Sequence, residues 1–306
     1  MKRDYEEMTF FKFKERYQTE EDCREKLFRI KWFDGYVCPK CGHNEYYEIK
    51  ERNLYQCKKC RHQTSLTAGT IMHRTCTPLV KWFWAFYLIS TDKRGISALG
   101  LSNKLSLHYK VAWLMLHKIR KAMGDRDERY KLQWLIEMDE TFIGASSEGN
   151  KKKGRGTEKT KVVIGVSLEE DTVYFTNPPA GGVDKVNKEE IKGILLKDVD
   201  ENQTLKTDGW KAYSIAEELG HEHQVIKIDG SGKKAHQIFK WVHILAANLK
   251  AFIEGTLHGL DKKHLQAYLN EFCYRFNRRF WENQLFDRLL YASITSKGIT
   301  YADLRG

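Results

Sequence analysis

Two pairs of cysteines constrain the fold of this chain more than any other feature of its sequence. Cys38 and Cys41 form one C-x-x-C pair, Cys57 and Cys60 form the other, and 15 residues separate the two pairs. This spacing is typical of a zinc ribbon, in which four thiolates hold one tetrahedral Zn²⁺ ion. Because four sulfur ligands close the coordination shell, we expect a structural metal site with no position for a substrate.

The remaining cysteines favour reduced thiols over a disulfide framework. The chain has seven cysteines in 306 residues, an odd number in a long chain. Cys23, Cys76 and Cys273 fall at apolar positions of helical patterns, where we expect thiols buried in the core.

The charge balance indicates a polyanionic partner. The 52 Lys and Arg residues exceed the 41 Asp and Glu residues, giving a net charge of +11. We expect nucleic acid rather than a membrane, because no basic amphipathic anchor is evident. The longest apolar run, residues 82–89, is far shorter than the ~20 residues that span a bilayer, and the N-terminal residues do not form a signal peptide. The expectation is a soluble cytoplasmic protein; charge alone would equally suit a basic protein with no nucleic-acid partner.

Hydrophobic periodicity predicts an α+β multidomain chain. The predicted regions, in chain order, are N-terminal helices (1–35), the zinc ribbon (36–75), helices with a helix-turn-helix (76–124) and an α/β domain (132–295).

The helix-turn-helix is predicted from residues 78–123. We expect helices at about 78–90, 96–104 and 107–122, with Thr77 as the first N-cap, Pro78 at the first helical position and Gly124 ending the last helix. The last helix has apolar residues that would pack inward, namely Val111, Leu114, Met115 and Ile119. It also has cations that would face the major groove of DNA, among them Lys110, Lys118 and Lys121. A plain helical bundle with solvated lysines is the alternative.

The α/β domain begins where the period changes, at Trp134. LIEMDETFIG, KVVIGVSLE and TVYFTN are typical of consecutive strands. The expected elements after them are a helix at about 188–197, a strand at QTLKTD, a helix at 210–219, a strand at VIKI and helices at about 237–254, 262–277 and 284–292. This order is that of a ribonuclease H-like domain, a mixed sheet flanked by helices, although other α/β domains share it.

Residues 151–161 interrupt this pattern with a basic loop. The segment KKKGRGTEKTK has six cations and one acid between two predicted strands. We interpret it as a mobile, non-specific phosphate clamp, with a plain solvated loop as the alternative.

Two aspartates mark the candidate catalytic site. Asp139 lies inside an apolar strand, where a charge is costly unless it is paired or bound to metal. Asp208 ends a strand just before Gly209, at the carboxyl edge where α/β sites form. Carboxylates on neighbouring strands hold Mg²⁺ or Mn²⁺ in nucleases of this fold and support phosphoryl transfer.

The long helix at 237–254 should supply the third ligand. His243 and Lys250 are seven residues apart, almost two full turns, and so share one face. Helical geometry favours His243 as the third ligand and Lys250 as a phosphate contact. Glu254 lies on the same face but about 16 Å further along the axis, and Asn248 points about 140° away from His243. Both remain rivals.

A last basic segment, residues 274–279, interleaves aromatic rings with cations. Arg275 and Arg278 would suit contacts with the DNA backbone. Solvated arginines on a packing helix are an equal alternative.

Together these segments resemble the zinc-ribbon insertion-sequence transposases of bacteria, related to the Merlin superfamily, whose DDE-type catalytic domain is ribonuclease H-like. The matching segments are CREKLFRIKWFDGYVCPKCGH, YQCKKCRHQTSLTAGT, IEMDETFIG, TDGWKAY, VHILAANLKAFIEGTLHG and HLQAYLNEFCYRFNRR. They cover the chain from about residue 8 to residue 292.

The resemblance implies an enzyme that binds the terminal inverted repeats of its element, cleaves there and joins the ends to target DNA. The family's two catalytic aspartates fall on Asp139 and Asp208, and its basic residue on Lys250. The third position, Glu in many relatives and commonly Asn in others, falls on His243. Pairing of two DNA ends implies at least a dimer on double-stranded DNA.

Two other functions stay open at this stage. His243 in place of a carboxylate is compatible with an inactive DNA-binding regulator that keeps the zinc ribbon and the helix-turn-helix. An RNA-processing nuclease of the same fold would use the same metal chemistry.

Overall fold

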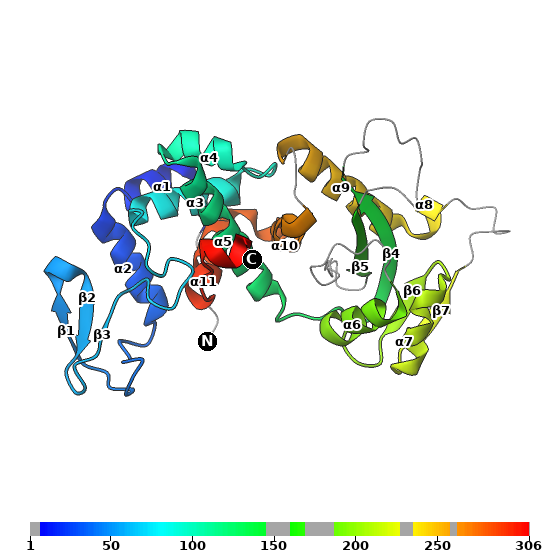
Figure 1. Ribbon diagram of the computed structural model, residues 1–306, viewed down its shortest axis with the longest axis horizontal. Coiled ribbons are helices and arrows are strands. Elements are labelled where there is room, and N and C mark those ends of the chain that lie inside the picture. The colour runs from blue at the N-terminus through cyan, green and yellow to red at the C-terminus, as the bar shows by residue number, and fades with distance from the viewer. Residues whose placement is uncertain (1–6, 145–159, 169–186, 227–234, 258–261, 306) are drawn as a thin grey trace. The chain divides into compact units, whose positions relative to one another are not determined.

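The computed structural model describes residues 7–144, 160–168, 187–226, 235–257 and 262–305. The chain divides into two compact units (Figure 1). Unit 1 comprises residues 1–126 and 280–306, and unit 2 comprises residues 127–279. Unit 2 is thus inserted in the sequence of unit 1, and the last part of the predicted domain 132–295 belongs to unit 1.

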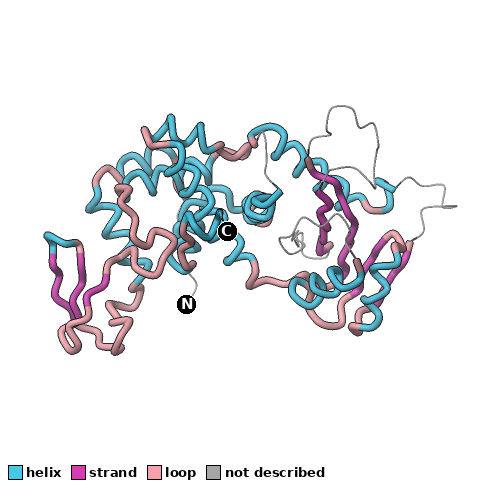
Figure 2. Tube along the Cα trace, viewed as in Figure 1, coloured by secondary structure: helices cyan, strands magenta, loops and turns pink. Residues whose placement is uncertain are grey.

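Unit 1 is mainly helical (Figure 2). Its helices are α1 (Phe10–Arg16), α2 (Glu20–Lys31), α3 (Leu79–Thr91), α4 (Ala98–Leu105), α5 (Tyr109–Asp127, one residue past the boundary), α11 (Leu285–Thr295) and α12 (Tyr301–Arg305). The two short N-terminal helices predicted from the sequence are confirmed, and each begins at a threonine. Thr9 accepts a hydrogen bond from the Lys12 N–H, and Thr19 forms a capping box with Asp22.

Aromatic rings from distant parts of the chain form the core of unit 1. Phe286 of α11 lies 5.4 Å from Phe13 of α1 and 6.0 Å from Phe83 of α3, measured between ring centroids. Tyr17 lies 4.9 Å from Phe83. Because all four rings are buried, α11 is part of the same core as the N-terminal helices.

The first helix of the predicted helix-turn-helix begins one residue later than expected. Pro78 is the N-cap of α3, without a side-chain hydrogen bond of its own. The Glu20 carboxylate of α2 accepts instead from the N–H groups of Leu79 (3.0 Å) and Val80 (2.9 Å). The predicted Thr77 cap is wrong. The first N–H groups of the helix have no partner within the helix, and a carboxylate from another helix accepts from them instead.

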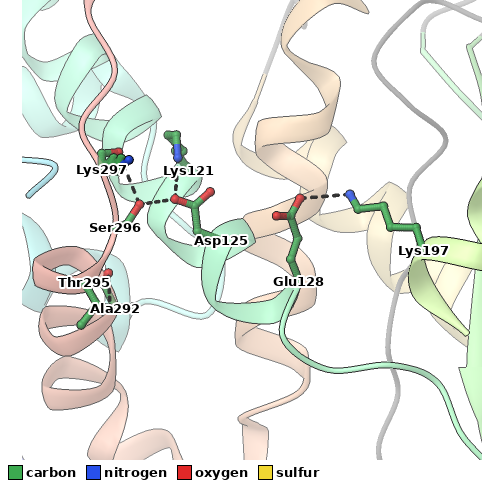
Figure 3. A network of polar contacts seen from close by, with 8 residues as sticks. All are labelled: Lys121, Asp125, Glu128, Lys197, Ala292, Thr295, Ser296 and Lys297. Carbon is green, nitrogen blue, oxygen red and sulfur yellow. Dashed lines mark hydrogen bonds and ion pairs between the residues drawn. The ribbon is translucent and has the colours of Figure 1, made fainter. Parts of the chain in front are cut away.

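The last helix of the same region runs past its predicted end. Gly124 is buried inside α5, which continues to Asp127. A helical glycine costs about 1 kcal/mol relative to alanine, and here the packing of the surrounding turns outweighs this cost. In Figure 3, Asp125 pairs with Lys121 one turn earlier and also accepts from the Ser296 hydroxyl.

The zinc ribbon is a small antiparallel sheet. Strands β1 (Tyr46–Ile49), β2 (Leu54–Cys57) and β3 (Gln63–Thr64) lie in the order β1-β2-β3. Tyr46 pairs with Cys57 and Tyr55 with Thr64. The predicted hairpin between the two cysteine pairs is confirmed.

Unit 2 contains a mixed sheet, as predicted, and four of its strands lie in the described residues. These four are β4 (Leu135–Ile143), β5 (Thr160–Ser167), β6 (Thr204–Thr207) and β7 (Glu222–Val225), in the order β5-β4-β6-β7. β5 is antiparallel to β4, whereas β6 runs parallel to both β4 and β7.

Helices cover both faces of this sheet. The helices of the described part of unit 2 are α6 (Lys188–Asp198), α7 (Ile215–Glu218), α8 (Ala235–Ile238), α9 (Lys240–Thr256) and α10 (Leu265–Phe276). Ile136 and Met138 of β4 pack in one cluster with residues of α6 and α7. Ile143 packs with α9 and α10 in another. Because side chains alternate along a strand, Glu137, Asp139 and Thr141 point to the α9 face.

Three details of unit 2 differ from the sequence prediction. The strand expected at VIKI begins earlier, at Glu222, because its pairing with β6 sets its register. The expected helix at 237–254 is broken at Phe239 into α8 and α9. Lys161, assigned to the basic loop, lies in β5. The rest of that loop up to residue 159, and the strand expected at TVYFTN, lie outside the described residues. None of the helices in the described segments has an apolar run of the length that crossing a bilayer demands.

Candidate functional site

The four ribbon cysteines converge as the spacing predicts. Their sulfur atoms all lie within 4.8 Å of one another, with Cys38 Sγ 3.6 Å from Cys60 and Cys41 Sγ 3.6 Å from Cys57. Zn–S bonds of about 2.3 Å in a tetrahedron place sulfurs about 3.8 Å apart. The site therefore fits a structural Zn²⁺ ion.

The two C-x-x-C turns have the same backbone geometry. In the first, the Cys38 N–H donates to the His43 carbonyl and the Gly42 N–H to the Cys38 carbonyl, both at 2.9 Å. In the second, the Cys57 N–H donates to the His62 carbonyl and the Arg61 N–H to the Cys57 carbonyl. The residue after each pair is left-handed, with φ of +72° at Gly42 and +56° at Arg61.

The cysteines outside the ribbon divide between core and surface. Cys23 and Cys273 are buried, as predicted. Cys76 is exposed, and the prediction of a core thiol there is wrong because it precedes α3 in a loop. Helical spacing predicts burial only for residues within a helix. Cys76 lies in a loop, so its apolar side chain does not indicate that it is buried.

Asp139 lies in β4, and Asp208 directly follows the neighbouring parallel strand β6. Glu137 of β4 pairs with Lys206 of β6, and each aspartate lies two residues further along the chain. Parallel strands are about 4.8 Å apart, so the backbone places the two aspartates at neighbouring positions of the sheet. The Asp208 charge also contributes to the raised pKa of Asp139.

A tight turn holds Asp208 just after β6. Its Oδ1 accepts a hydrogen bond of 3.0 Å from the Trp210 N–H. Gly209, between them, has φ of +83°, and a Cβ there would lie 2.7 Å from Val225 Cγ1. Both the backbone conformation and the space require glycine.

His243 of α9 approaches Asp139. Its Nε2 lies 4.0 Å from Asp139 Oδ2. The buried side of α9 is formed by Val242, Leu245, Ala246, Leu249 and Ile253. His243 and Lys250 flank this buried side and are partly exposed, whereas Asn248 and Glu254 are exposed.

The environment of Asp139 disfavours a bare negative charge. Burial raises its pKa to about 6, and the charge of Asp208 adds to this effect. A hydrogen bond of 2.7 Å from the Glu140 N–H and the charge of Lys161 oppose it. Carboxyl groups with a shifted pKa are often functional. A cation bound beside Asp139 would favour its ionised form.

Sequence reasoning missed a second charged cluster beside these aspartates. Lys161 of β5 pairs with Glu140 at 3.2 Å and lies 4.3 Å from the centre of the Trp210 ring. Burial, followed by the charges of Glu140, Asp139 and Asp208, raises the pKa of Tyr213 well above its usual value. The apolar strand pattern around Glu140 was the available signal, as it was for Asp139.

The lysines of α5 that were predicted to face DNA differ in their exposure to solvent. Lys110 is exposed, as expected. Lys118 is only 9% exposed, and burial lowers its pKa. Lys121 is partly buried and pairs with Asp125. The expectation that all three face outward is wrong because α5 is buried around most of its circumference from Met115 onward.

The arginines of residues 274–279 are also largely enclosed. Arg275 pairs with Glu271 at 3.6 Å. Arg278 is 7% exposed, pairs with Asp127 at 2.7 Å and stacks on the Tyr274 ring. Neither the predicted backbone contact nor the solvated alternative describes Arg278, because a carboxylate and an aromatic face enclose it.

Two family models match this chain. Residues 18–63 match a transposase zinc-ribbon domain, and residues 131–277 match an ISXO2-like transposase domain. The first match contains the four cysteines, and the second contains Asp139, Asp208 and His243. A search of curated proteins gave no match. From these two domains in this order, we conclude that the chain belongs to the zinc-ribbon insertion-sequence transposases.

Proposed function

We propose that this protein binds the terminal inverted repeats of its element and catalyses divalent-metal-dependent strand cleavage and strand transfer. One observation carries the proposal. Asp139 and Asp208 each lie two residues beyond the paired residues Glu137 and Lys206 of neighbouring parallel strands, and His243 Nε2 approaches Asp139 at 4.0 Å, all within the matched transposase domain.

The donor set of this site suits a divalent cation. Two carboxylates favour Mg²⁺ or Mn²⁺, and the imidazole suits Mn²⁺ better than Mg²⁺. Bound by Asp139, Asp208 and His243, such ions would activate water or a 3′-hydroxyl and stabilise the leaving oxygen. Burial and, to a smaller extent, the charge of Asp208 raise the pKa of Asp139, and a bound cation would favour its ionised form.

DNA contacts are assigned to cations that remain accessible. Lys250, two turns after His243 on the same side of α9, would contact a phosphate next to the cleavage site. Lys110 at the start of α5 would contact DNA from the helix-turn-helix. Lys118 and Arg278 are not assigned this role because both are buried. Synapsis of two ends would require at least two copies of the chain.

A cleavage assay on DNA carrying the flanks of this protein's own gene tests the proposal. We expect nicking at the repeat ends in Mg²⁺ or Mn²⁺, and its loss in Asp139→Asn and Asp208→Asn. The control Glu189→Gln, an exposed carboxylate of α6, should cleave as wild type does. DNA binding, measured by gel shift, should be equal in all four proteins. Binding without cleavage in either metal would contradict the proposal and favour a DNA-binding regulator.

The same assay tests the third ligand. His243→Ala should lose cleavage, whereas Asn248→Ala should retain it because Asn248 is exposed and turned about 140° from His243. Loss of cleavage in Asn248→Ala with full activity in His243→Ala would contradict the assignment of His243.

A further inference from the structure

We propose that Glu137 and Lys206 are positioning residues that fix the start of α9, and with it His243, against the two aspartates. The inference rests on the proposed function for its meaning, but it concerns contacts that exist without metal or DNA.

One ammonium group connects three elements of the site. Lys206 Nζ donates to Glu137 Oε1 at 2.9 Å and to the Ile238 carbonyl at 2.8 Å. It also lies 5.4 Å from the centre of the Phe239 ring. The side chains of Glu137 and Lys206 are 4% and 18% exposed. Lys206 of β6 thus joins β4 to the break between α8 and α9.

Each end of this connection is a short step from a candidate site residue. Glu137 and Lys206 are paired across β4 and β6, and Asp139 and Asp208 follow two residues later along the chain. On the helix side, the His243 N–H donates to the Phe239 carbonyl at 3.1 Å. His243 is therefore one helical turn from the backbone that Lys206 holds.

The start of α9 lacks a side-chain N-cap, so the bond from Lys206 to the Ile238 carbonyl contributes more to its placement than it would at a capped helix. Its N-cap is Phe239, which provides no side-chain hydrogen bond within the described part of the chain. The Phe239 side chain is buried, and the preceding carbonyl is bound by Lys206. A polar contact with defined geometry fixes an orientation that apolar packing alone leaves freer.

The effect of the Glu137–Lys206 pair on stability can be separated from its effect on positioning, because two apolar side chains can replace a buried ion pair. Replacing both partners by hydrophobic residues of similar size often preserves stability, whereas removing one partner leaves a buried charge. The double variant Glu137→Met/Lys206→Met should therefore stay folded but lack the bond to Ile238. Lys206→Met alone should be less stable.

The matched control is the Lys197–Glu128 pair of the same unit (Figure 3). It has a similar distance, 3.0 Å, but both side chains are more than half exposed. Lys197→Met should leave the exchange of residues 240–244 and DNA cleavage at their wild-type values.

Two measurements on the double variant decide the proposal. Hydrogen–deuterium exchange of residues 240–244 in the metal-free chain should be faster than in wild type and in Lys197→Met, at a similar Tm. DNA cleavage should fall roughly 100-fold, the effect of a displacement of about 1 Å in a catalytic group. Wild-type exchange at residues 240–244 in the folded double variant would overturn the inference. Exchange does not depend on catalysis, so a chain that cleaves no DNA would refute the proposed function without deciding this inference.

Discussion

Gly209 allows Asp208 to stand at the end of β6 with its carboxylate at the sheet edge. Gly209→Ala would place a Cβ 2.7 Å from Val225 Cγ1 and impose a left-handed φ of +83° on alanine. We expect a loss of about 1–2 kcal/mol from the backbone alone, measured by urea unfolding. Gly193→Ala is the control, because Gly193 lies in α6 with open space at its Cβ. It should gain about 0.5–1 kcal/mol. Equal effects at the two glycines would contradict this account.

Asp198 makes the stability of unit 2 depend on pH. Burial raises its pKa to about 6; Lys197 and Lys131 oppose the shift, and Glu128 adds to it. Between pH 3.8 and 6 the folded chain retains a proton that the unfolded chain has lost. The contribution of Asp198 to stability is therefore present at low pH and is lost as the pH rises through this window.

Asp198→Asn should remove this dependence. Relative to wild type, we expect the variant to gain roughly 1–2 kcal/mol between pH 4 and pH 7, allowing for screening by solvent. Urea unfolding of both proteins at several pH values measures the difference. A difference that is constant with pH would rule out the assigned pKa shift.

The candidate site could be predicted where the information is local. A charge in an apolar strand indicated Asp139, a strand end before glycine indicated Asp208, and helical spacing indicated His243. The pairing of Lys206 with Glu137 could not be predicted, because it depends on which strands are neighbours in the sheet. The family matches support the transposase domain, and the roles of these residues remain proposals.

At the scale of elements, the zinc ribbon is the part most dependent on a ligand. Its hairpin is short, and its tyrosine rings pack against one another, with Tyr36 4.8 Å from Tyr46 and Tyr46 5.3 Å from Tyr55. We expect Cys57→Ser, or chelation of zinc, to unfold the ribbon, since metal binding supplies much of the folding free energy of such domains.

The measurement is zinc content together with near-ultraviolet circular dichroism of these rings. Cys76→Ser is the matched control, because Cys76 is exposed and outside the thiol group. It should retain zinc and the wild-type spectrum. Retention of zinc at wild-type affinity by Cys57→Ser would contradict the four-thiolate site.

Element prediction failed where tertiary contacts override local pattern. The sequence of α5 suggested a helix with one cationic face, but residues around most of its circumference are buried. The start of α3 depends on Glu20, which is nearly 60 residues away in the sequence. Neither fact is contained in the periodicity of the segment itself.

At the scale of the whole molecule, unit 2 is an insertion whose ends lie together. Asp127 and Arg278, at its two ends, form an ion pair of 2.7 Å. Helix α11 follows unit 2 in the sequence but belongs to unit 1, where its Asp287 pairs with Lys26 of α2 at 2.9 Å. An amphipathic C-terminal helix does not reveal its partner, so the sequence could not assign α11 to unit 1.

This organisation makes a prediction about fragments. Residues 127–279 should fold alone with a cooperative transition, because both ends of the unit are held by its own contacts. Residues 1–126 should not, since they lack α11 and the Phe286 ring. Joining 1–126 to 280–306 by a short linker should restore folding. Circular dichroism during thermal unfolding tests all three, and cooperative folding of 1–126 alone would contradict the division.

The central claim is that Asp139, Asp208 and His243 form one divalent-metal site. Iron-directed cleavage of the polypeptide tests it most directly: Fe²⁺ replaces the ion, and ascorbate with peroxide generates radicals that cut the chain nearby. We expect cuts near residues 139, 208 and 243 that Mn²⁺ suppresses and that Asp139→Asn abolishes. Cuts confined to other segments, or cuts near these residues that persist in Asp139→Asn, would contradict a shared metal site.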